Sequence, residues 1–92
     1  MTRIIIKEFV WDSINLEHIK KHSISGDEVE QAKNFICHWR THTGRYLIVS
    51  RVGSRMISVV LRRVSNGRYY VVTARDAGKK DRRRAYEKEN EK

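Results

Sequence analysis

The side chains best suited to proton transfer lie near position 20 of this sequence. His22 directly follows Lys20 and Lys21, and imidazole changes its charge near neutral pH. Cleavage of RNA without a metal needs a base for the 2′-hydroxyl, cations for the charge that develops on the phosphate, and an acid for the leaving oxygen. His22 could carry the proton in such a reaction. The alternative is that it only interacts with the dipole at a helix end.

Arginine is concentrated in the middle of the chain. Residues 1–39 hold five Lys or Arg against six Asp or Glu, and residues 76–92 hold seven against five. Between positions 40 and 75 there is no acidic residue, but there are eight arginines: Arg40, Arg45, Arg51, Arg55, Arg62, Arg63, Arg68 and Arg75. The net charge of +9 therefore comes almost entirely from this stretch. Because the guanidinium fork matches phosphate oxygens, we expect a polyanion-binding surface rather than a basic face that is merely solvated.

Two groups of functional residues follow from these patterns. The predicted catalytic group joins the proton carrier to cations for the phosphate: Lys21, His22, Arg51 and Arg75. The predicted RNA-binding group holds other cations and a tyrosine that neighbours them: Arg55, Arg63, Lys79, Lys80, Arg82, Arg83 and Tyr86. For Arg75 the alternative is a structural ion pair with Asp76 or Asp12. The basic run 82–84 could instead be a solvated helix face or a docking site for an acidic protein.

The histidine spacing also permits a metal site, which we consider and do not predict. His18 and His22 stand four residues apart, as do His38 and His42, and this interval is common among metal ligands. A zinc site would need carboxylates or thiolates converging with them, and Cys37 is the only thiol. The lysines beside His22 argue against a cation there. We therefore expect no metal and no cofactor.

Local patterns predict the elements that position these residues. Strands are expected over 3–11, 45–52, 55–64 and 68–74, with a weaker candidate over 35–41. Helices are expected over 12–22, with Asp12 as its cap, over 26–34, where Ser25 and Glu28 have capping-box spacing, and over 77–88. The predicted fold is α+β. It has two N-terminal helices packed on an antiparallel sheet of about four strands, with a basic C-terminal helix, in one domain spanning 1–92.

Strand alternation predicts where the arginines lie. Side chains on alternate residues share a face, so Thr73 and Arg75 are expected on the same face as Tyr69. Antiparallel neighbours could then gather Arg51, Arg55 and Arg75 near one rim of the sheet. Such a rim suits a bent RNA strand.

Composition also bears on compartment. The chain has a single cysteine and no run of about 20 apolar residues. Its first residues lack the apolar length and the cleavage site of a signal peptide. We expect a cytoplasmic protein with no membrane partner.

The order of several short motifs resembles the BrnT-type ribonuclease toxins of bacterial toxin–antitoxin pairs. Residues 9–12 are Phe-Val-Trp-Asp, residues 18–22 are His-Ile-Lys-Lys-His, and an acidic helix start follows at 27–32. In the second half, residues 73–77 are Thr-Ala-Arg-Asp-Ala, and Lys-Lys-Asp-Arg-Arg follows at 79–83. The resemblance covers nearly the whole chain. It implies a RelE-like fold, a metal-independent endoribonuclease that inhibits translation, and neutralisation by a ribbon-helix-helix antitoxin.

The chain departs from that pattern in its turns. Ser23 stands where many relatives carry Gly, Gly26 where many carry Pro, and Gly78 where a Thr is common. These changes should alter loop stiffness more than chemistry. Two alternatives to a toxin stay open: a non-catalytic basic RNA-binding module, and an inactive relative that acts only in a regulatory complex.

Overall fold

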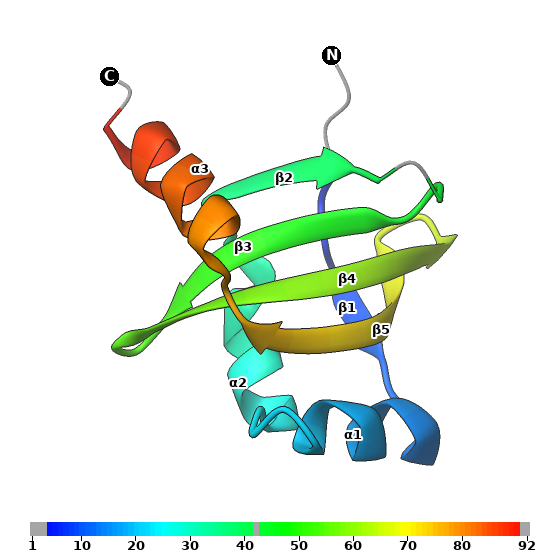
Figure 1. Ribbon diagram of the computed structural model, residues 1–92. Helices are drawn as coiled ribbons and strands as arrows, with labels where there is room; N and C mark the ends of the chain where they lie inside the picture. Colours follow the sequence, from blue (N-terminus) through cyan, green and yellow to red (C-terminus); the bar gives the residue numbers. More distant parts are fainter. Residues whose placement is uncertain (1–3, 42, 91–92) are drawn as a thin grey trace.

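The computed structural model describes residues 4–41 and 43–90. Within these ranges the order of the main elements is β1 (Glu8–Val10), α1 (Ser13–Lys20), α2 (Gly26–Glu30), β2 (Cys37–Arg40), β3 (Tyr46–Val52), β4 (Arg55–Ser65), β5 (Arg68–Asp76) and α3 (Lys79–Glu89). A 3-10 turn, η1 (Gln31–Lys33), extends α2. The described strands form one sheet in the order β1-β5-β4-β3-β2. Figure 1 shows α3 crossing in front of the sheet, whereas α2 lies behind it.

The α+β class is confirmed, but the predicted sheet is wrong in two respects. The described sheet has five strands rather than about four, because the weak candidate at 35–41 does form β2. The sheet is also mixed rather than antiparallel, because β1 pairs parallel to β5, with Phe9 opposite Tyr69. Parallel neighbours need a long connection between them, and here the rest of the chain between β1 and β5 supplies it.

Local capping signals set the starts of the first two helices as predicted. At α1 the Asp12 carboxylate accepts from the Asn15 backbone N–H, and the Asn15 side chain accepts from the Asp12 N–H, both at 2.9 Å. At α2 the same reciprocal pattern joins Ser25 and Glu28. These bonds satisfy backbone donors that have no partner inside the helix. The prediction for the last helix was less accurate, since α3 begins after Gly78, at Lys79, rather than at residue 77.

The two faces of the sheet bury separate apolar clusters. One face packs under α1 and α2, where Ile19, Val29 and Ala32 meet Ile48 and other side chains from the central strands. The other face packs under α3, where Ala85 meets Val49 and Met56. Of the apolar side chains of α1, Ile19 is buried, but Ile14 and Leu16 are exposed.

A bulge in β5 moves the end of that strand to the opposite face from the one predicted. Val60 pairs with Thr73, but the next residue of β4, Leu61, pairs with Val71, so Val72 is an extra residue in the ladder. Tyr69 and Val71 therefore point into the cluster under α1 and α2. Thr73 and Arg75 point to the face that carries α3.

Candidate nucleic-acid interface

The face of the sheet that carries α3, which we call the α3 face, presents two parallel rows of side chains. Strand pairing defines a covered row made of Cys37, Val49, Ser58 and Arg75. The next row, which we call the open row, consists of Trp39, Leu47, Val60 and Thr73, one from each of β2 to β5. All four members of the open row are half-buried. Three of them are apolar, so the open row forms a partly exposed apolar surface on the sheet beside α3.

Helix α3 packs on the covered row through Ala85 and through a hydrogen bond from Ser58. Ala85 is fully buried in the cluster that contains Val49. One turn earlier, the Ser58 hydroxyl donates to Asp81 Oδ2 at 2.8 Å. Because Arg75 is the strand neighbour of Ser58, this bond places the start of α3 next to Arg75.

Arginines stack on aromatic rings across this face. The Arg84 guanidinium of α3 lies 4.4 Å from the ring centre of Trp39 in the open row. On the far side of that row, Arg62 lies 5.0 Å from the ring centre of Tyr70. At the hairpin end, Arg51 lies 5.7 Å from the ring centre of Tyr86. Such pairs hold a planar cation beside an apolar surface, which suits both phosphates and bases.

Two hollows gather many of the predicted RNA-binding residues along α3. One, of about 270 Å³, lies between the β3–β4 hairpin and the helix and is lined in part by Arg51, Arg55, Arg82 and Tyr86. The other, of about 390 Å³, runs along the helix and is lined by Lys79, Arg82, Arg83, Tyr86, Glu87 and Asn90. The hollows share Arg82 and Tyr86, so they adjoin. Arg51 and Arg55 thus line the same hollow, but Arg75, the third arginine predicted at this rim, is not among its lining residues.

Two of the predicted cations are already held by carboxylates. Arg51 donates from Nε to Glu89 Oε2 at 2.7 Å and from Nη2 to Glu89 Oε1 at 3.1 Å. This bonding by Arg51 lowers the pKa of Glu89. Arg55 donates to Asp76 and to Glu28, and it also donates to the Ser23 carbonyl at 3.0 Å. Arg55 therefore has a structural role, tying the α1–α2 turn to the end of β5.

Other predicted cations have no such partner. Within residues 4–41 and 43–90, no hydrogen bond, ion pair or ring contact engages the side chains of Arg75, Lys79, Lys80 and Arg83. The structural alternative for Arg75 is therefore not realised. Asp76 binds Arg55 instead, and Asp12 accepts from the Tyr70 hydroxyl and from the Asn15 backbone N–H at the start of α1. These four side chains remain available to an anionic ligand.

The remaining predicted residues lie elsewhere. Lys21 and His22 are exposed in the turn between α1 and α2, on the opposite side of the sheet from the α3 face, and the His22 ring contacts His18 at 5.7 Å between centres. Arg63 lines a hollow with Tyr46 and Tyr69 on that same side. The predicted catalytic group is therefore divided between the two faces. Arg55 links the turn to the end of β5, so both parts lie toward one end of the sheet.

Four residues of the α3 face were absent from the predicted groups: Arg62, Arg84, Trp39 and Tyr70. Alternation along β4 could have separated Arg62 from Arg63, since neighbouring residues of a strand face opposite ways. The partner of Arg84 is 45 positions away in sequence, so no local signal predicted that Arg84 would lie over Trp39.

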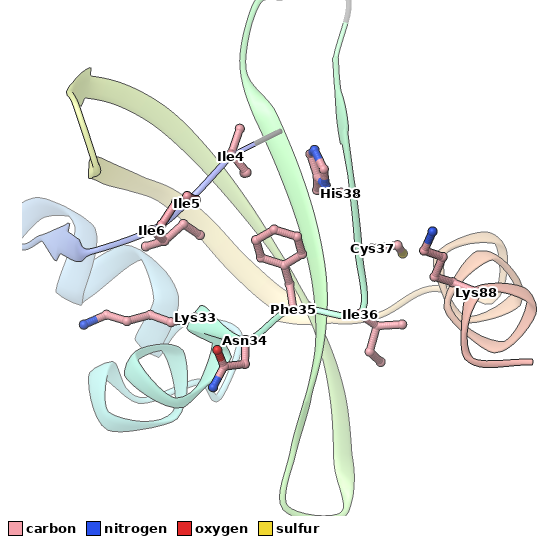
Figure 2. Close-up of a pocket in the computed structure, with 10 residues that line it drawn as sticks. All are labelled: Ile4, Ile5, Ile6, Lys33, Asn34, Phe35, Ile36, Cys37, His38 and Lys88. Carbon is pink, nitrogen blue, oxygen red and sulfur yellow. The ribbon is translucent and has the colours of Figure 1, made fainter. Parts of the chain in front are cut away.

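A larger hollow of about 630 Å³ lies away from these cations. Figure 2 shows the side chains that line it, from the segment Ile4–Ile6, from residues 33–38 and from α3. None of the predicted catalytic or RNA-binding residues is among them. Cys37, at its border, is half-buried, and burial raises the pKa of its thiol.

Comparison with known proteins leaves the family unassigned. No protein-family model matches the chain, and no curated protein matches it. Among the described residues, no three His, Cys, Asp or Glu side chains are grouped as metal ligands, and His42 lies outside that part of the chain. No helix formed by the described residues is long and apolar enough to span a membrane.

Proposed function

We propose that this protein is a metal-independent endoribonuclease toxin that binds RNA on its α3 face and cleaves it, thereby inhibiting translation. The observation that carries the binding part is the set of cations without partners, Arg75, Lys79, Lys80 and Arg83, around the start of α3. A phosphate that approaches them does not have to displace a carboxylate. Each such contact releases counterions from the nucleic acid and strengthens binding.

The cleavage part rests on the BrnT-like motifs and on the chemistry of two residues. Arg75 is the arginine of the predicted catalytic group whose guanidinium is not engaged, so it is the better candidate to stabilise charge on the phosphate. His22 is the proposed proton carrier. An RNA strand that bends around the shared end of the sheet would have to reach both residues. Arg51 is already paired with Glu89, so in this proposal it binds RNA only after that ion pair opens.

A non-catalytic RNA-binding module is the second candidate. The observation that favours it is the separation of His22 from the α3 face, because proton transfer needs an acid or base within hydrogen-bond reach of the scissile phosphate. A binder would use the same cations without cutting the strand.

The proposed protein partner is an acidic antitoxin of the ribbon-helix-helix type, in the cytoplasm. Basic residues along α3 give such a partner a complementary surface, and the same residues would contact RNA. Antitoxin binding there would exclude RNA by competition, which is a simple way to neutralise the toxin.

Incubation of purified protein with RNA in excess EDTA tests this function. The wild type should cut the RNA, Arg75→Ala should lose most of the rate while still binding, and Arg40→Ala is the matched control. Arg40 is exposed, and its guanidinium lies over Tyr46 on the other face of the sheet. A wild type that binds RNA and leaves it intact would favour the non-catalytic module. If Arg75→Ala cut as fast as Arg40→Ala, Arg75 would be removed from the mechanism.

A further inference from the structure

Two arginine–aromatic pairs flank Leu47, Val60 and Thr73 of the open row. On one side stands Arg84 over Trp39, and on the other Arg62 over Tyr70. Lys80 lies one helical turn before Arg84 on α3, so both border the same side of the row. Between the pairs lie the half-buried side chains of Leu47, Val60 and Thr73. Apart from Lys80, none of these residues is assigned a role by the function proposed above.

We infer that the open row is a binding site for unpaired nucleotides, with Trp39–Arg84 and Tyr70–Arg62 as two base-stacking positions. The inference rests on the proposed RNA function and specifies its substrate as single-stranded. An aromatic ring or a guanidinium plane offers a flat surface on which any exposed base can stack. The apolar surface of the open row excludes water beneath the bases. The cations at its borders donate hydrogen bonds to the phosphates.

The distance between the two positions fits a short stretch of single strand. Trp39 and Tyr70 lie on strands three steps apart, and Tyr70 is displaced by two residues along the sheet. With neighbouring strands ~4.8 Å apart and ~3.4 Å per residue, the separation is about 16 Å. A strand in a duplex rises that far in about five nucleotides, and an unstacked strand spans it with fewer. The row therefore takes a segment of a few nucleotides.

Double-stranded RNA does not satisfy this site. Its bases are stacked on one another and paired, so their faces cannot reach Trp39 or Tyr70. A duplex can still touch the cations of α3, but only through phosphates. The site should therefore bind single-stranded RNA more tightly than duplex RNA whose strands carry the same charge.

The first test measures the affinity of uncleavable RNA. A fluorescently labelled 2′-O-methyl oligonucleotide lacks the 2′-hydroxyl nucleophile, so it reports binding alone, as a single strand or as the matching duplex. Tyr70→Leu should weaken single-strand binding roughly ten-fold and leave duplex binding nearly unchanged. Tyr70→Phe keeps the ring and loses only the hydrogen bond to Asp12, so its affinity should stay near that of the wild type.

The arginines are tested against a charge-matched control. Arg62→Gln and Arg84→Gln should weaken single-strand binding more than Arg40→Gln does, although each removes one positive charge. Arg40 is the appropriate control because it also lies over a tyrosine ring, but on the face covered by α1 and α2. Thermal melting of each variant confirms that it is folded.

Tryptophan fluorescence gives a second readout. Stacking of a base on Trp39 should quench its emission, and Trp39→Phe should remove the quenching. The indole Nε1–H of Trp11, the other tryptophan, donates to Glu30 Oε2 at 2.7 Å, and its ring packs against the core. Its emission should therefore not respond to RNA.

Equal affinity for duplex and single strand, or equal loss of affinity in Tyr70→Leu and Tyr70→Phe, would overturn the inference even if the wild type cleaves RNA. If the wild type neither binds nor cleaves RNA, the proposed function fails as well.

Discussion

Arg55 binds Asp76 through two nitrogens of its guanidinium, Nε at 3.1 Å and Nη2 at 2.8 Å, and both reach the same carboxylate oxygen. The third nitrogen, Nη1, reaches Glu28 and the carbonyl of Ser23. One side chain at the start of β4 therefore joins the end of β5 to the turn between α1 and α2. This cluster holds the two parts of the predicted catalytic group at one end of the sheet.

Loss of Arg55 should destabilise the fold more than loss of Arg75. Arg55→Ala leaves Glu28 and Asp76 as neighbouring carboxylates without their cation, whereas Arg75→Ala removes a guanidinium that engages no described residue. Thermal unfolding at neutral pH should give a clearly lower midpoint for Arg55→Ala and a nearly unchanged one for Arg75→Ala. Equal midpoints would show that the cluster contributes nothing to stability.

The same cluster makes stability depend on acid. The pKa of Glu28 is lowered from 4.5, chiefly by the hydrogen bond from the Ser25 backbone and also by Arg55. A carboxylate with a lowered folded pKa stabilises the fold above its unfolded pKa, and that contribution is lost as the pH falls through the folded pKa. The melting midpoint should therefore drop as the pH falls below about 4.5, the unfolded value. Glu28→Gln should flatten this dependence.

A matched control separates this effect from general acid sensitivity. Glu17 is exposed on α1, and no described residue bonds to its carboxylate. Glu17→Gln should therefore leave the slope of midpoint against pH as in the wild type. If Glu28→Gln gave that same slope, the acid sensitivity would have to come from other carboxylates, such as Glu30 or Glu89, whose pKa values are also lowered.

Asn15 should be the most sensitive polar position of α1. Its side chain is almost fully buried, donates from Nδ2 to the Val10 carbonyl at 2.9 Å, and accepts from the Asp12 N–H. Asn15→Ala leaves both backbone groups without partners, which should lower the free energy of unfolding by about 2 kcal/mol. Urea unfolding measures it, and Asn34→Ala, at an exposed asparagine, should change stability little. A loss no larger than that of Asn34→Ala would contradict the role of this cap.

Ser23 offers a stabilising change. Its φ is +61°, a left-handed conformation that glycine adopts more easily than residues with a Cβ. Ser23→Gly should raise the free energy of unfolding by about 0.5 kcal/mol, the relief of strain being partly offset by the greater entropy of glycine in the unfolded chain. Ser23→Ala keeps the Cβ and should give no such gain. A gain in both variants would point to the hydroxyl rather than to the backbone.

Short-range signals predicted the local features of the fold, and long-range pairing decided the rest. The capping pairs Asp12–Asn15 and Ser25–Glu28 each span three residues, so sequence spacing sufficed to predict a helix start. The turns at Gly53 and Gly67 were likewise predictable, and both glycines have positive φ. The parallel pairing of β1 with β5 joins segments about 60 residues apart, and no local pattern encodes it.

The candidate site shows the same division. Arginine content alone predicted a basic surface, and the hollow beside the hairpin does gather Arg51, Arg55 and Arg82. The face on which Arg75 lies was predicted wrongly, because the extra residue Val72 reverses the alternation. The sequence also could not show which arginines are paired with carboxylates, because such partners lie far apart along the chain, as Glu89 does from Arg51.

Release of Arg51 from Glu89 should strengthen RNA binding if the α3 face is the interface. Glu89→Gln removes the negative charge that holds the Arg51 guanidinium at 2.7 Å and frees that cation for a phosphate. Glu87→Gln changes the net charge by the same amount two residues earlier on α3, where no described residue bonds to the carboxylate. Glu89→Gln should therefore bind uncleavable RNA more tightly than Glu87→Gln and show a steeper dependence on salt, by about one additional phosphate contact. Equal affinities and equal salt slopes for the two variants would mean that RNA does not contact Arg51, and would confine the interface to the start of α3 and the open row.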